Sequence, residues 1–285
     1  MKFEALNQAI QRAAELISKA DSLLFTAGAG MGVDSGLPDF RGNEGFWKAY
    51  PPYRKLGRSF IEMANPQGFS SDPAFAWGFY GHRLNLYRET KPHEGFQILL
   101  EWGRAKPGGC AVMTSNVDGH FQRAGFDREP VYEIHGSINH FQCTLPCGDE
   151  IWSAQGLEIE VDEETMRARQ PLPRCPHCDA VARPNILMFG DWNYIGNRND
   201  EQRRLFDAWL AERRESRIVI LEFGAGKAVP TVRMFSEEVC RQSPEATLIR
   251  FNPRDPEVPR DRDVSIASGA LESILAIASC RLEES

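Results

Sequence analysis

The chain has 285 residues, and its 42% hydrophobic and 26% charged content is that of a globular protein rather than a disordered one. A formal net charge of -7 argues against direct binding of nucleic acid, which requires a concentrated lysine and arginine face. No apolar stretch approaches the roughly 20 residues of a membrane span, and the amino terminus lacks a secretory signal pattern. We therefore expect a cytoplasmic protein with no membrane partner.

The first expected elements are a helix and a strand. Apolar residues recur at three- and four-residue steps from residue 3 to residue 19, which is typical of an amphipathic helix packed on a core. The apolar run 22–26 then predicts a strand that ends in Gly28, Ala29 and Gly30. This loop also fits an ordinary tight turn, but a glycine loop after a strand lets backbone N–H groups approach a phosphate.

Four further apolar runs predict the other strands, at residues 110–114, 217–223, 247–251 and 264–267. The segments between them are long enough for helices, an alternation that indicates a mainly parallel sheet. Because the runs are continuously apolar, we expect the strands to be buried on both faces. The predicted fold class is therefore α/β, a Rossmann-like parallel sheet with helices on both faces, plus a small domain.

The small domain is expected to come from two segments that interrupt this alternation. Residues 46–90 are rich in aromatic residues and proline and predict a helical insertion, whereas residues 137–182 contain four cysteines around an acidic stretch. Residues 1–45, 91–136 and 183–285 would then form the nucleotide-binding domain.

Four of the seven cysteines stand in two close pairs, Cys143 with Cys147 and Cys175 with Cys178, and 27 residues separate the pairs. Four soft thiolates suit tetrahedral zinc, and a site filled by sulfur leaves no open position, so one zinc ion would be structural. The paired spacing disfavours the alternative of four unrelated thiols. An odd total without a secretory signal disfavours disulfides.

The segment 28–42, GAGMGVDSGLPDFRG, closely resembles the cofactor-binding signature of the sirtuin family. Similar blocks follow in family order from about residue 22 to 275, among them TSNVDG at 114–119, EIHGS at 133–137, the four cysteines, FGD at 189–191, GAG at 224–226 and Phe251-Asn252. The resemblance implies an enzyme that uses NAD as co-substrate to remove acyl groups from protein lysines, releasing nicotinamide and O-acyl-ADP-ribose. Its partners would be acyl-lysine proteins or peptides.

The resemblance also implies roles for single residues. His135 would be the catalytic base, since an imidazole accepts a proton near neutral pH, with Asn116 facing the nicotinamide ribose and Asp118 binding the carboxamide. The cofactor site would comprise Gly28, Ala29, Gly30, Asp39, Phe40, Arg41, Ser115, Asn116, Val117, Asp118, Gly224, Ala225, Gly226, Asn252 and Ala270. Leu187, Phe189 and Gly190 would hold the substrate backbone as an added strand, although a buried strand also fits residues 185–189.

Tyr80 and Arg83 stand three residues apart, so on a helix they would share one face. They resemble the Tyr-x-x-Arg pair of sirtuins that act on succinyl-, malonyl- or glutaryl-lysine. A guanidinium in an apolar acyl pocket would pair with the distal carboxylate of such a group. The alternative is a tyrosine and an arginine on a helix surface.

Several residues depart from the family pattern. Gly32, Ser115, Ala225-Gly226 and Pro253-Arg254 replace side chains that would bond the ribose and adenosine, and three residues rather than two separate Cys143 from Cys147. The changed contacts keep two alternatives open. One is a mono-ADP-ribosyltransferase or NAD hydrolase using the same pocket, and the other is a non-catalytic NAD-binding sensor.

Overall fold

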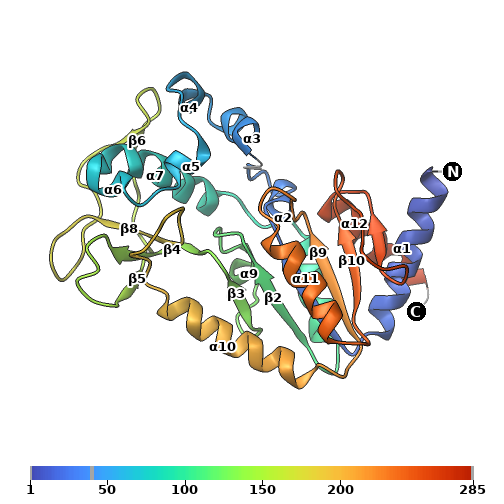
Figure 1. The fold of residues 1–285 in the computed structure, drawn as a ribbon. Coiled ribbons are helices and arrows are strands. Elements are labelled where there is room, and N and C mark those ends of the chain that lie inside the picture. The colour runs from blue at the N-terminus through green and yellow to red at the C-terminus, as the bar shows by residue number, and fades with distance from the viewer. Residues whose placement is uncertain (1, 39–41, 284–285) are drawn as a thin grey trace.

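The computed structural model describes residues 2–38 and 42–283 of the chain (Figure 1). Its main sheet has the strand order β11-β10-β9-β1-β2-β3, and all neighbouring strands run parallel. The strands are β1 (Ser22–Ala27), β2 (Cys110–Thr114), β3 (Val131–Glu133), β9 (Ile218–Phe223), β10 (Thr247–Phe251) and β11 (Val264–Ile266). The predicted parallel sheet is confirmed, and β3 is an additional short strand at its edge.

Helices cover both faces of this sheet, as predicted. On one face lie α1 (Lys2–Lys19), α8 (Gly95–Arg104), α9 (His120–Arg123) and α12 (Ala270–Glu283), and on the other α10 (Asn197–Glu212) and α11 (Thr231–Gln242). Successive side chains of β1 point to the hydrophobic cores on opposite faces of the sheet. Leu23 and Phe25 pack toward α1, whereas Leu24 packs toward α10 and α11. Burial on both faces explains the continuously apolar strand sequences.

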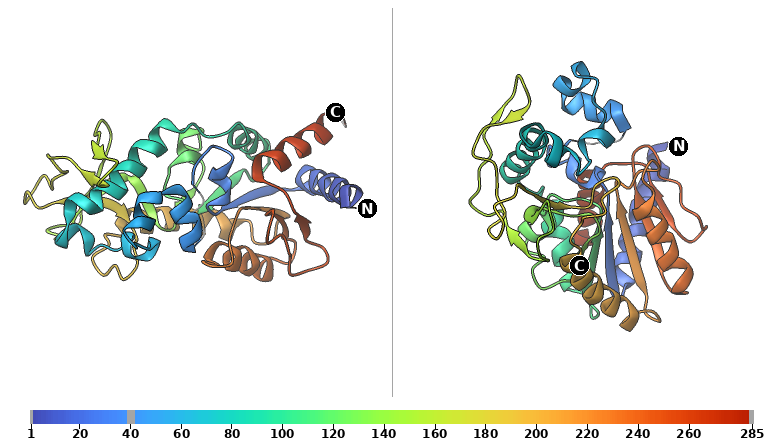
Figure 2. Two further views of the ribbon diagram at one scale, coloured as in Figure 1. Left: turned by 90° about the horizontal axis from the view of Figure 1, so that it is seen from above. Right: turned by 60° about the vertical axis from the view of Figure 1, so that its left-hand side comes forward.

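A second packed region lies beyond one end of the sheet, away from the helices α1 and α12 that hold the chain termini (Figure 2). It contains α3 (Gly42–Ala49), α4 (Pro51–Lys55), α5 (Phe60–Met63), α6 (Gly68–Ser71), α7 (Pro73–Glu89), β4 (Gly136–Cys143), β5 (Ile151–Ser153), β6 (Val161–Asp162), β7 (Arg167–Ala168) and β8 (Ala182–Ile186). The strands β5, β4 and β8 form an antiparallel sheet. The aromatic residues of 46–90 build the hydrophobic core of this region, including Phe46, Trp77 and Phe79.

Helix α7 is the central element of this second region. Asp72 caps its first turn by accepting the N–H of Phe75 at 3.3 Å, and Pro73 occupies a first-turn position where its missing N–H is not needed. Gly78 permits close packing, because a Cβ there would lie 1.9 Å from the carbonyl oxygen of Met166. The helix therefore holds the β6–β7 hairpin against its outer face and leaves its other faces for the core.

The strands β1, β2, β3 and β9 all end, at their carboxyl termini, on the side of the sheet that faces the second region (Figure 1). We call this side the carboxyl edge of the sheet. In open parallel sheets this edge is where ligands bind, because the connecting loops and helix starts converge there. Within the described ranges, no helix combines the length and the apolar character needed to cross a membrane.

Candidate functional site

Two glycine loops touch at the carboxyl edge of the sheet. Gly28 donates its N–H to the Phe223 carbonyl at 2.9 Å, and Gly30 donates to the Gly224 carbonyl at 3.2 Å. Gly224 has a φ of +58°, and a Cβ on it would lie 2.3 Å from the Gly30 Cα. Glycine is therefore required at this position whether or not a ligand is bound, because the loops after β1 and β9 are in backbone contact.

The loop after β2 is tied to the same place. Asn116 donates its side-chain amide to the Gly28 carbonyl at 3.0 Å, and its own N–H bonds the Thr114 hydroxyl at 3.1 Å. The Ser115 N–H bonds the Ala27 carbonyl at 3.0 Å. The structure thus brings Gly28, Ser115 and Asn116 together where β1 and β2 end.

Asp118 is buried at the end of this loop. Its carboxylate accepts the N–H of His120 at 2.8 Å, and burial raises the pKa of the carboxyl to about 6 against the opposing effects of that bond and of Arg83 and Arg123. The positive charge of Arg83, on α7, is one of the groups that oppose this rise in the pKa of Asp118. Asp118 therefore changes charge close to neutral pH.

His135 follows β3, directly across from the loop that carries Ser115. Its ring donates to the Ser115 carbonyl, and burial outweighs that bond to lower the pKa of the imidazole below its ordinary value of 6.5. The neutral ring therefore predominates at pH 7, and the bond to Ser115 selects one tautomer. A neutral, oriented imidazole can accept a proton.

The segment after β8 carries Leu187, Phe189 and Gly190. Leu187 donates its N–H to the His135 carbonyl at 2.9 Å, and Phe189 donates to the Ala64 carbonyl at 3.0 Å. The buried-strand interpretation holds only as far as Ile186, because the Leu187 and Phe189 side chains are 42% and 43% exposed. A cavity of about 290 Å³ opens beside Gly190, between this segment and the α5–α6 connection.

Tyr80 and Arg83 lie on α7 and are 0% and 6% exposed, so the helix-surface alternative is wrong. The guanidinium of Arg83 lies 5.7 Å from the Tyr80 ring and 5.2 Å from the rings of Phe79 and Tyr87. It donates to the Tyr87 hydroxyl at 3.1 and 2.8 Å. The Tyr80 hydroxyl is also buried, and among the described residues it has no hydrogen-bond partner. The structure therefore brings the two side chains together inside a buried aromatic cluster.

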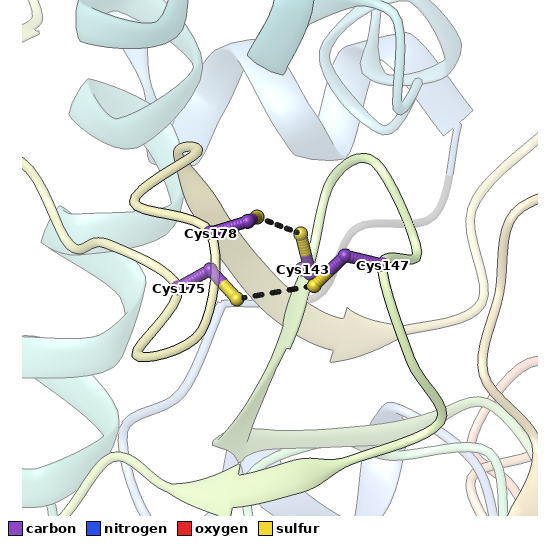
Figure 3. Close-up of side chains that lie close together, drawn as sticks. All are labelled: Cys143, Cys147, Cys175 and Cys178. Atoms are coloured by element: carbon purple, nitrogen blue, oxygen red, sulfur yellow. Dashed lines mark hydrogen bonds between the residues drawn. The ribbon is translucent and has the colours of Figure 1, made fainter.

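The four paired cysteines converge as predicted (Figure 3). Their sulfur atoms all lie within 4.8 Å of one another, and Cys143 with Cys178, and Cys147 with Cys175, approach to 3.6 Å. Tetrahedral zinc with bonds of about 2.3 Å to sulfur would hold its ligands about 3.8 Å apart. The donor set and its spacing therefore fit a structural zinc ion, and the three-residue gap in the first pair does not prevent it.

Among the remaining predicted cofactor residues, Ala225, Gly226 and Asn252 follow β9 and β10, whereas Val117 follows β2 and Ala270 begins α12. Asn252 is fully buried, donates to the Ala225 carbonyl at 2.9 Å and accepts the N–H groups of Arg254 and Asp255, both at 3.0 Å. Its side chain thus shapes the two loops beside it. Val117 and Ala270 are buried as well, and Gly226 continues the β9 loop. Asp39, Phe40 and Arg41 lie outside the described residues.

Sequence reasoning missed some partners of the predicted residues. Tyr87 stands four residues after Arg83 on α7, and that helical spacing could have identified it. Ala64 and Asn139 act through contacts between distant segments: the Ala64 carbonyl accepts from Phe189, and Asn139 donates to the Asp118 carbonyl at 3.2 Å. No local pattern indicates such contacts.

Comparisons with known proteins agree with this geometry. Residues 28–202 match the model of the Sir2 family. An NAD-dependent protein deacylase of Aeropyrum pernix is 28% identical over 93% of this chain and 94% of its own, and a mitochondrial NAD-dependent protein deacylase sirtuin-5 of Danio rerio is 32% identical over 62% and 59%. The solved structure of a Sir2 homologue mutant with ADP-ribose is 25% identical, with a TM-score of 0.69 over 95% of this chain and 96% of that one. With a family match across more than half of its length, the chain belongs to the Sir2 family.

Proposed function

We propose that this chain is an NAD-dependent protein lysine deacylase that acts on acylated proteins in the cytoplasm. The observation that carries the proposal is the convergence of three candidate groups at one edge of the sheet: the loop with Asn116 and Asp118, the imidazole of His135, and the segment starting at Leu187, whose N–H bonds the His135 carbonyl. Relatives named NAD-dependent protein deacylases support it.

In this proposal NAD binds to the large domain, predicted as residues 1–45, 91–136 and 183–285, of which residues 183–186 belong to β8 and pair with β4 of the second region. When bound, NAD would supply a ribose carbon to which the acyl oxygen bonds, with nicotinamide as the leaving group. The touching glycine loops would approach its phosphates with Gly28, Ala29 and Gly30, together with Asp39, Phe40 and Arg41. Ala225, Gly226, Asn252 and Ala270 would serve the adenosine end. The insertions 46–90 and 137–182 would form the small domain.

His135 would remove a proton from a ribose hydroxyl after the acyl group has been captured. Its lowered pKa keeps the ring neutral at pH 7, and the Ser115 carbonyl holds one nitrogen so that the other can face the substrate. Asp118, ionised above pH 6, would accept an N–H of the nicotinamide carboxamide, and Asn116 would orient the ribose.

The substrate would enter as an extended strand along Leu187, Phe189 and Gly190. Main-chain hydrogen bonds carry such binding, so many peptide sequences should be accepted. Gly190 has a φ of +67° and a Cβ there would meet open space, so the backbone at this point is accessible to a partner chain.

We further propose a preference for acidic acyl groups such as succinyl and malonyl. The buried Arg83 guanidinium and the Tyr80 hydroxyl, which lacks a partner among the described side chains, could both donate to a distal carboxylate. The rings of Phe79 and Tyr87 lie beside the buried guanidinium, and burial strengthens a charge-assisted bond there.

The zinc ion would be structural. Cys143, Cys147, Cys175 and Cys178 would fill its coordination sphere and thereby fix β4, which runs back to His135, against the turn that precedes β8. Metal binding would contribute to folding and not to the reaction.

Product analysis separates this function from its alternatives. The chain is incubated with NAD and a panel of acyl-lysine peptides, and the products are identified by mass spectrometry. A deacylase yields deacylated peptide, nicotinamide and O-acyl-ADP-ribose in equal amounts. ADP-ribosylated protein or free ADP-ribose without deacylated peptide would instead favour the transferase or hydrolase, and NAD binding without nicotinamide release would favour a sensor.

A further inference from the structure

The strand before His135 is the last strand of the main sheet, and helix α10 covers its open edge. Among the strands of residues 2–38 and 42–283, β3 pairs with β2 alone. On its other side the Glu133 N–H donates to the side-chain oxygen of Gln202 at 3.1 Å, and the Asn199 side-chain amide donates to the Glu133 carbonyl. Two side chains of α10 thus take the hydrogen bonds that a neighbouring strand would otherwise make.

The same helix also binds the side chain of Glu133. This carboxylate is 1% exposed, accepts the Gln202 amide at 3.1 Å and forms an ion pair with Arg198. Gln202 therefore makes two bonds to one residue, one to its backbone and one to its carboxylate. Since Glu133 lies only two positions before His135, these bonds fix the chain where the imidazole departs from it.

Residues 191–196 connect the candidate substrate segment, Leu187 to Gly190, to helix α10. The Tyr194 hydroxyl bonds the side-chain oxygen of Asn199, and a Cβ on Gly136 would lie 2.8 Å from that hydroxyl. Leu187 also bonds the His135 carbonyl. Hydrogen bonds and the chain itself therefore form a closed loop of contacts. This loop runs from Glu133 to His135, then through the segment 187–190 to α10, and from α10 back to Glu133.

We propose that Gln202 is a positioning residue for His135, assisted by Asn199 and Arg198. The closed loop of contacts would keep the imidazole of His135 in register with the bound acyl-lysine strand. The proposal rests on the deacylase function proposed above. Gln202 does not touch the reacting atoms, so its loss should impair the proton transfer that needs His135 more than the steps that do not.

The test substitutes Gln202→Leu, which keeps the size of the side chain but removes both bonds to Glu133. Formation of O-acyl-ADP-ribose should fall about tenfold to a hundredfold, as for a small displacement of a general base. Exchange of labelled nicotinamide into NAD on an acyl peptide, which precedes that proton transfer, and the KM for NAD should each change by less than about threefold.

A matched control is Gln97→Leu, since Gln97 also donates to a glutamate, Glu101 at 3.2 Å, but on the exposed surface of α8. It should leave every rate unchanged. The reciprocal exchange Glu133→Gln with Gln202→Glu restores a donor and acceptor pair between the same positions and should recover at least about a third of the parental rate of product formation.

Three outcomes would overturn the inference: a parallel loss of exchange and product formation in Gln202→Leu, no loss in either, or the same loss in Gln97→Leu. If the parent chain has no deacylase activity, the proposed function fails, but the positioning remains measurable. The NMR signals of the His135 imidazole, assigned through His135→Asn, should shift in Gln202→Leu and not in Gln97→Leu. Unchanged signals in both would contradict the positioning role.

Discussion

Replacing Arg83 by methionine should reverse the acyl preference of the enzyme. Methionine fills most of the volume of the arginine stem and can pack against the rings of Phe79, Tyr80 and Tyr87, so the pocket keeps its shape while it loses the charge. Truncating one partner of a buried charge pair costs about 2 to 5 kcal/mol. At about 1.4 kcal/mol per tenfold, the kcat/KM for succinyl-lysine should fall roughly 30- to 4,000-fold.

Acetyl-lysine has no distal carboxylate to pair with Arg83, so its turnover should stay level or rise when an apolar methionine side chain faces the apolar acyl group instead of a buried guanidinium. The assay compares kcat/KM for succinyl- and acetyl-lysine versions of one peptide in the parent and in Arg83→Met. Arg58→Met is the control, since Arg58 is half-exposed and pairs with Glu62 on the surface. Equal kcat/KM for the two peptides in the parent, or an equal loss for both in Arg83→Met, would refute the reasoning.

The remaining predictions concern the base, the metal and the carboxamide site. His135→Ala should lower deacylation about a hundredfold or more but leave the Kd for NAD, measured by calorimetry, within about threefold, and a variant that deacylates at the parental rate would contradict its role. Elemental analysis should find one zinc ion per chain, and Cys175→Ala should give insoluble protein, whereas soluble, folded Cys175→Ala would argue against a structural metal. Because burial raises the pKa of Asp118 to about 6, the carboxylate that accepts the carboxamide N–H is lost below that pH. The KM for NAD should therefore rise as pH falls from 7 to 5, and Asp118→Asn should abolish this dependence; a KM that stays flat in the parent would refute it.

Local sequence signals predicted most of the sheet. The runs that become β1, β2, β9, β10 and β11 are apolar on both faces, and that property is visible in a single sequence. β3 is only three residues long, and its residue Glu133 is charged, so no apolar run marks it. It is held by the side chains of α10, about 65 residues later in the chain, and such a contact has no local signal.

The site shows the same division. The spacing of the four cysteines in the sequence predicts a zinc site, and four thiolates favour tetrahedral coordination. Tyr80 and Arg83 could be placed on one helical face, but their burial depends on the aromatic residues of α3 and α4 and on Gly78 and Gly81, which let the β6–β7 hairpin close over α7. A helix with aromatic residues on every side has no clear apolar face, so periodicity alone does not predict which face other elements bury.

The central claim is that the chain couples cleavage of NAD to deacylation through His135. The most direct measurement is the stoichiometry of nicotinamide, deacylated peptide and O-acyl-ADP-ribose in a single reaction with a succinyl-lysine peptide, for the parent and for His135→Ala. We expect equal amounts of the three products for the parent, and for His135→Ala a loss of deacylated peptide and O-acyl-ADP-ribose while NAD still binds. Nicotinamide released by the parent without a matching amount of deacylated peptide would contradict it.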